Sequence, residues 1–234
     1  SFFGSLRFPR KFMKRFFLLL PFLFFLSSCG RLDTILYVPQ QTPETWLQIQ
    51  PYLEFNRLVI VQPSTSIIVY LLGVLTIAVG LYFLKIRDGQ RSRFWWGIAM
   101  LLWGLGALLA GTSYEAFSYA IKCEGRTACL WTSWWEIAYL IVSVWSIDAM
   151  MLAVAHSSAD GKLRKQLSMY ALINAVFYFG VVMAGAFIPV KFLISFELLL
   201  VVAAPSVIAF FAINGWRYAK YKLDADLVSL GAWL

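Results

Sequence analysis

Charged side chains are scarce in this sequence, and so are histidine and cysteine. Charged residues make up 14% of the 234 positions, against about 25% in soluble globular domains. There is a single histidine, His156, and there are three cysteines. The sequence has no CxxC pair, no zinc-finger spacing and no glycine-rich phosphate loop. These absences argue against a soluble domain, a His-rich zinc site and a nucleotide site of the phosphate-loop kind.

Apolar side chains take the place of the missing charge. They make up 61% of the residues, and a helix needs about 20 of them to cross a bilayer. Five apolar runs approach this length, at residues 67–84, 94–110, 137–155, 168–188 and 192–213, and a sixth begins near residue 227. We therefore predict an all-α fold, a polytopic transmembrane helical bundle formed by residues 66–234. Because the sixth run stops at Leu234, we interpret it as a truncated span.

The N-terminal part has the layout of a bacterial signal sequence. Residues 13–15 are Met-Lys-Arg, and the apolar run 16–26 is too short to span comfortably. It ends in Leu26-Ser27-Ser28-Cys29, which resembles the lipobox of bacterial lipoproteins. That resemblance implies that residues 13–28 are removed and that Cys29 is lipidated. The alternative is an ordinary anchor helix with an incidental cysteine.

This interpretation makes residues 1–12 a non-native segment upstream of the true start. It also places residues 29–65 outside the cytoplasm, because a lipid-modified N-terminus lies there. That segment is rich in proline and has no long apolar run. The short apolar run 57–61 fits either a strand or an interfacial lead-in to the first span.

The basic residues give an independent indication of orientation. With the N-terminus outside, the loops after the first, third and fifth spans are cytoplasmic. Those loops carry ten basic residues, namely Lys85, Arg87, Arg91, Arg93, Lys162, Arg164, Lys165, Arg217, Lys220 and Lys222. The outer side carries five, namely Arg31, Arg57, Lys122, Arg126 and Lys191. The positive-inside rule therefore agrees with a bacterial inner (plasma) membrane location and an extracytoplasmic N-terminus.

The same distribution bears on the partners. The net charge of +8 would suggest nucleic acid in a soluble chain, but here the basic residues lie in short loops between spans. We therefore expect the lipid bilayer as partner and no nucleic acid.

Two cysteines mark the outer side. Cys123 and Cys129 fall in the loop that is predicted to be extracytoplasmic, and five residues separate them. Disulfides persist in the periplasm and not in the cytosol. No histidine lies nearby to suggest a metal site. We therefore predict a disulfide between Cys123 and Cys129.

Polar residues within the spans are candidates for function, because they are unfavourable in lipid. Asp148 in the third span and Asn174 in the fourth lie at similar depths, since the two helices run in opposite directions. We predict a hydrogen bond between them. It is either a structural clamp between helices or part of a proton or ligand site.

Three carboxylates lie near the outer ends of the spans. Glu115, Glu136 and Glu197 are at one level, so they are either solvated residues or the lining of an outward-facing pocket. Glu197 has apolar neighbours, and we expect it to face the bundle interior and meet Ser113, Glu115 or Glu136. With Asp148, these three carboxylates are the candidate catalytic residues. No metal or other cofactor is expected.

The membrane body resembles the CREST hydrolase superfamily, which includes alkaline ceramidases. That family has a Ser four residues before a His on its second span and an Asp on its third. Here the residue four positions after Ser113 is Phe117 instead of His, and Asp148 takes the place of the Asp. The resemblance implies a membrane hydrolase. The alternatives are a transport or sensory module with an outward-facing carboxylate site, and a lipid-anchored scaffold.

Overall fold

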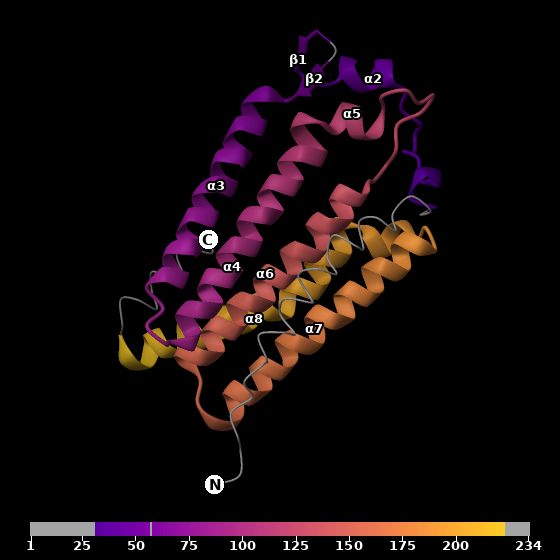
Figure 1. The fold of residues 1–234 in the computed structure, drawn as a ribbon. Helices are drawn as coiled ribbons and strands as arrows, with labels where there is room; N and C mark the ends of the chain where they lie inside the picture. The colour runs from indigo at the N-terminus through magenta and orange to yellow at the C-terminus, as the bar shows by residue number, and fades with distance from the viewer. Residues whose placement is uncertain (1–30, 57, 223–234) are drawn as a thin grey trace, which may run out of the picture.

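The computed structural model describes residues 31–56 and 58–222, and five long helices dominate them (Figure 1). Each is long and apolar enough to cross a membrane. They are α3 (Pro63–Lys85), α4 (Arg91–Ala110), α6 (Trp134–Ser158), α7 (Gly161–Phe187) and α8 (Phe196–Tyr221). The π-helix η3 (Gly111–Ala116) continues α4 without a break. The predicted all-α bundle with five spans is confirmed.

The helices are longer than the apolar runs that predicted them. α7 begins at Gly161 and α8 ends at Tyr221, whereas the runs cover 168–188 and 192–213. Polar turns extend both helices at the same end of the bundle, because a helix does not need apolar residues once it leaves the lipid. At the other end, the 3-10 helix η4 (Lys191–Ile194) precedes α8.

Several predictions lie outside the described residues. They are the segment 1–12, the signal sequence 13–28, the lipobox with Cys29, and the truncated sixth span near residue 227.

The helix α6 is the centre of the bundle. It packs against α4, α7 and α8, and its side chains supply much of the buried apolar core, among them Leu140, Val144 and Met151. By contrast, α3 packs on α4 and η3 and leaves side chains such as Leu71 exposed. In a membrane, lipid chains cover this face.

Glycines allow α3 and α4 to approach closely. A Cβ added at Gly104 of α4 would lie 2.6 Å from the carbonyl oxygen of Gly73 in α3. A larger residue there would push the two backbones apart. This is how small residues let helices pack without a hydrophobic driving force between them.

A small cap covers one end of the bundle, drawn at the top of Figure 1. We use the name cap for residues 31–56, 58–62 and 117–133. Its elements are η2 (Arg31–Thr34), α2 (Pro43–Gln48), β1 (Tyr52–Phe55), β2 (Leu58–Val61) and α5 (Ser118–Lys122). The two strands form an antiparallel hairpin, so the strand interpretation of the run 57–61 is confirmed.

The two parts of the cap are joined through their backbones. Leu36 and Leu130 form an isolated antiparallel bridge, and the N–H of Trp131 donates to the carbonyl of Ile35. The N–H of Cys129 donates to the carbonyl of Gln41. Residues that precede the first span are thereby fixed to the loop between α5 and α6.

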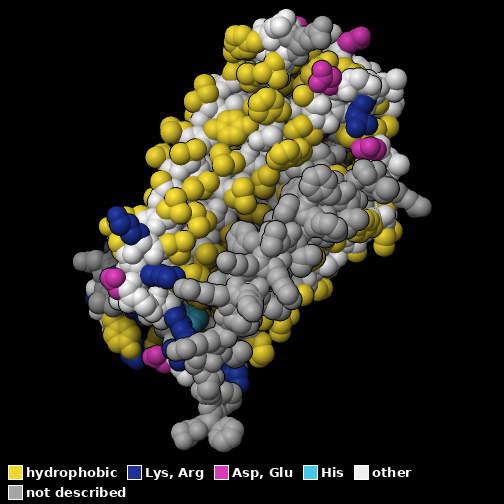
Figure 2. Space-filling view, viewed as in Figure 1, with side chains coloured by type: hydrophobic (Ala, Val, Ile, Leu, Met, Phe, Trp, Pro, Cys, Tyr) yellow, Lys and Arg dark blue, Asp and Glu magenta, His cyan; other side chains and the backbone are white. Residues whose placement is uncertain are grey.

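The basic residues gather at the end opposite the cap. The ten lysines and arginines counted as cytoplasmic lie in the α3–α4 turn, at the start of α7 and at the end of α8. Figure 2 shows Lys and Arg side chains at that end and hydrophobic side chains along the facing side of the bundle. At the other end, Lys191 donates to the carbonyl of Leu36 in the cap. One end of the molecule is therefore strongly basic.

Candidate functional site

The cap has a disulfide at its core. Cys123 and Cys129 are joined, as predicted, and both are fully buried against Trp46. Tyr37 and Tyr119 pack around them. The bridge closes the loop that follows α5 and fixes it to the N-terminal part of the cap.

Next to the disulfide, the cap buries a lysine. Lys122 ends α5 and is 1% exposed, and its Nζ forms an ion pair with Oε1 of Glu136, which is 2% exposed. Glu136 lies in the first turn of α6. Lysine and glutamate are almost never fully buried unless they are paired. The pair therefore links the cap to the central helix of the bundle by two charges that water does not reach.

Three aromatic rings surround the ammonium group. The centroids of Tyr114, Trp46 and Tyr37 lie 5.0, 5.8 and 5.9 Å from Nζ of Lys122. Nζ also donates to the hydroxyl of Tyr37, at 3.5 Å. A cation within about 6 Å of a ring face is attracted by the ring quadrupole, and more strongly where water is excluded. We call Lys122, Glu136 and these three aromatic residues the lysine cage.

The carboxylate of Glu136 has further donors. It accepts from the hydroxyl of Thr132 and from the backbone N–H of Ser133. The second contact is one half of a capping box, because Ser133 is the N-cap residue of α6 and Glu136 is the third helical residue. Glu136 thus holds the start of α6 and the end of α5 together.

Glu115 is the neighbour of Tyr114 in the sequence but is not part of the lysine cage. It belongs to η3 and is half-buried, and its Oε2 has no hydrogen-bond partner among the described residues. Ser113 is fully buried and donates to the carbonyl of Leu109 in its own helix. The structure therefore gives Glu115 and Glu136 different environments.

The prediction for Glu197 is wrong. Its side chain is exposed and hydrogen-bonds with Ser195, the N-cap residue of α8. It does not face the bundle interior and does not meet Ser113, Glu115 or Glu136. Glu197 is the second residue of α8, and a carboxylate in a first helical turn is favoured by the positive end of the helix dipole. Of the two alternatives for the three carboxylates, a shared outward-facing pocket is excluded for Glu197, which is exposed.

The intramembrane pair has the predicted contact. Asp148 is 3% exposed and accepts from the amide of Asn174. The Ser206 hydroxyl of α8 is within hydrogen-bonding reach of Asp148 and lies 3.2 Å from the hydroxyl oxygen of Tyr170 in α7. The cluster therefore joins three helices at mid-bundle.

The residues that suggested a hydrolase are not grouped. Ser113 and Asp148 have the separate partners described above. His156 lies near the other end of α6, with Nδ1 2.8 Å from the carbonyl oxygen of Leu152. Within residues 31–56 and 58–222, no three His, Cys, Asp or Glu side chains come close enough to hold a metal ion. The chain matches no protein-family model, no curated protein and no solved structure.

The sequence did not single out Lys122, which was counted there only as one of the outer basic residues. Its one signal is its place directly before Cys123, since a predicted disulfide marks the packed part of a loop. The rings around it come from positions more than 70 residues earlier in the chain as well as from η3. Spacing along the sequence does not predict such contacts.

Proposed function

We propose that the protein is a sensory module of a bacterial inner membrane, with the cap outside the cytoplasm. The observation that carries the proposal is the buried pair of Lys122 and Glu136. Replacing a buried ion pair with well-packed apolar residues is often neutral or stabilising, so stability alone is a weak reason for this pair. It fixes the position of α6 relative to the cap. We infer that a ligand that perturbs the cap acts on the bundle through this link.

The central position of α6 suits it to carry such a signal. Glu136 is at its outer end and Asp148 is twelve residues further along, about 18 Å at 1.5 Å per residue. Asp148 accepts a hydrogen bond from Asn174 of α7. A displacement of α6 that follows separation of Lys122 from Glu136 would therefore reach α7. The ligand shifts the equilibrium only as far as it binds the two arrangements differently.

Two observations support the orientation. The ten basic residues lie opposite the cap, which agrees with a cytoplasmic basic end. The disulfide lies within the cap, which agrees with an oxidising compartment.

Lipidation at Cys29 belongs to the same proposal. Expression from Met13 in a bacterium is expected to yield a protein that begins at a lipidated Cys29. Mass spectrometry of the mature chain tests this. Retention of residues 13–28 would contradict it.

The hydrolase alternative has less support. It needs Ser113 and Asp148 at one reaction centre, whereas their hydrogen bonds go to Leu109 and Asn174. The transport alternative needs a path between the two ends of the bundle, whereas the pockets lined by Trp134 and by Pro189 lie at the cap.

Hydrogen–deuterium exchange on the full chain in nanodiscs tests the sensory proposal. Glu136→Gln keeps the shape of the side chain but removes its charge. We expect faster exchange in α5 and also at the far end of α6, around residues 150–158. The matched control is Glu115→Gln, a carboxylate on η3 that has no part in the lysine cage, and it should leave residues 150–158 unchanged. Faster exchange confined to the cap would show that the ion pair only stabilises the cap and transmits no change along α6. That result would overturn the proposal.

A further inference from the structure

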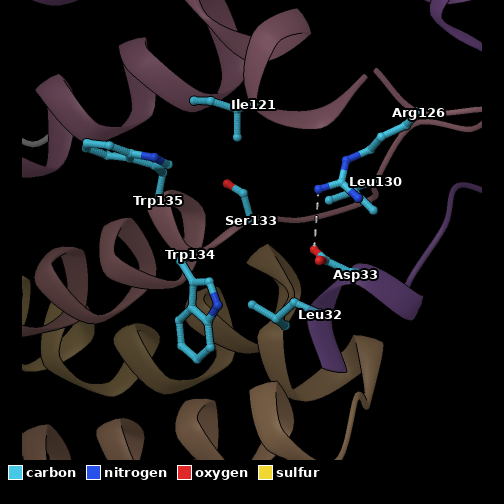
Figure 3. Close-up of a pocket in the computed structure, with 8 residues that line it drawn as sticks. All are labelled: Leu32, Asp33, Ile121, Arg126, Leu130, Ser133, Trp134 and Trp135. Atoms are coloured by element: carbon cyan, nitrogen blue, oxygen red, sulfur yellow. Dashed lines mark ion pairs between the residues drawn. The ribbon is translucent and has the colours of Figure 1, made fainter. Parts of the chain in front are cut away.

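A pocket of about 320 Å³ opens where the cap meets the start of α6 (Figure 3). Its walls are largely apolar and include Leu32, Ile121 and the indoles of Trp134 and Trp135. Figure 3 shows the Ser133 side chain between these walls, with Arg126 and Asp33 on one side. The pocket does not include Lys122 or Glu136, so it is separate from the lysine cage.

The hydroxyl of Ser133 is an unsatisfied polar group in this pocket. Ser133 is 8% exposed, and its Oγ has no hydrogen-bond partner among the described residues. It is the N-cap residue of α6, yet its side chain makes no capping hydrogen bond. Ser195, at the same position before α8, accepts from the N–H of Leu198 at 3.3 Å. A buried hydroxyl without a partner is unfavourable, so a ligand that pairs with it gains affinity.

The pocket also lies at the N-terminus of a long helix. Ser133, Trp134 and Trp135 line it, and α6 runs for 25 residues. The first N–H groups of a helix have no acceptor within it, and the helix dipole favours negative charge at this end. The helix terminus and the Ser133 hydroxyl therefore both favour a ligand that accepts hydrogen bonds and carries negative charge.

Arg126 supplies a cation that is only weakly held. Its Nη2 lies 3.7 Å from Oδ1 of Asp33, and the two side chains are 38% and 68% exposed. Exposed ion pairs of this kind contribute little, so the guanidinium is able to change partner. Guanidinium groups bind phosphate oxygens in a bidentate manner. An incoming anion must displace Asp33 from Arg126.

We infer that this pocket binds a phosphate group, either that of a phospholipid head group or that of a free phosphate ester. The phosphate oxygens accept from the Ser133 hydroxyl and from the N-terminus of α6 and pair with Arg126, while the apolar walls contact the rest of the ligand. Tryptophans are typical of the head-group layer of a membrane, where Trp134 and Trp135 begin the third span. The inference deepens the proposed function by naming the class of ligand, and rests on it for the role of the cap as receptor.

Binding to the full chain in a phosphate-free maltoside detergent tests the inference. The probes are a short-chain phosphatidylglycerol, glycerol phosphate and inorganic phosphate, measured by titration calorimetry. Ser133→Ala and Arg126→Gln are each expected to weaken binding about tenfold, a loss of one good hydrogen bond or ion pair. Asp33→Asn should tighten it several-fold, because the competitor for Arg126 is removed. If Asp33 only stabilised the fold of the pocket, Asp33→Asn would weaken binding instead.

Lys191→Gln is the matched control. It removes one positive charge from the same end of the molecule, and Lys191 does not line this pocket. Binding of phosphatidylglycerol alone assigns the site to lipid, and equal binding of glycerol phosphate assigns it to a free phosphate ester. No binding of any probe, or equal loss with Lys191→Gln, overturns the inference. In that case the exchange experiment with Glu136→Gln still decides the sensory proposal by itself.

Discussion

Asn174 donates its side-chain amide to both carboxylate oxygens of Asp148, at 3.0 and 3.2 Å. The two residues belong to adjacent helices, α6 and α7, and Asp148 is almost fully buried. Ser206 brings α8 to the same point. The arrangement fits a clamp between three helices.

Removal of the amide should weaken the bundle. Asn174→Leu leaves the Asp148 carboxyl without its main donor in an apolar interior, and we expect a loss of about 1–2 kcal/mol. Unfolding of the detergent-solubilised chain by SDS measures this. Asp148→Leu combined with Asn174→Leu should recover most of the loss, because no buried polar group is left unpaired.

The control for this experiment is Asn214→Leu. Asn214 is buried in α8 and donates to the carbonyl of Phe210, a hydrogen bond that lies within one helix. A loss at Asn214 as large as that at Asn174 would contradict the clamp.

Breaking the lysine cage should destabilise the cap. Lys122→Met leaves the Glu136 carboxylate buried and unpaired, and the expected loss is about 3–5 kcal/mol. Lys122→Met together with Glu136→Met should be close to wild type, since the two apolar side chains fill similar volume. Thermal unfolding followed by tryptophan fluorescence measures both. If Lys122→Met left the stability unchanged, the ion pair would not be intact in the protein.

Removal of the disulfide should loosen the cap but not the bundle. Cys123 and Cys129 are six positions apart, and closing so short a loop stabilises by about 2 kcal/mol in the chain-entropy model. In the double variant with alanine at both positions, we expect faster hydrogen–deuterium exchange in residues 35–48, which pack on the bridge. Exchange in α7 should not change. Faster exchange throughout the bundle would contradict a local role.

The sequence predicted those features that depend on one helix or on one short loop. Hydropathy located the five spans, and the rise per residue placed Asp148 and Asn174 at one depth. The disulfide followed from spacing and compartment. These predictions succeed because a helix in lipid must satisfy its backbone internally and has a fixed geometry.

Glu197 shows where such reasoning fails. The apolar run placed the start of the fifth span at residue 192, which put Glu197 a full turn inside the helix. The helix begins at Phe196, so the carboxylate is in the first turn. A polar residue among apolar neighbours fits an interior site or a helix terminus equally well. Which of the two applies depends on where the helix begins, and the predicted start was wrong by four residues. The lysine cage was missed for another reason, since it joins distant segments.

The proposed topology is open to a direct test by cysteine labelling in intact cells. We expect residues 112–135 outside and residues 85–93 and 156–167 inside, because the basic residues favour that orientation. Gln48→Cys lies on the exposed surface of α2 in the cap and Ser157→Cys at the exposed far end of α6. An impermeant maleimide should label the first and spare the second until the cells are broken. Because both positions are exposed in the fold, a difference in labelling reports the membrane side and not burial. Labelling of Ser157→Cys in intact cells would invert the orientation and place the lysine cage in the cytoplasm, where the disulfide beside it would not persist.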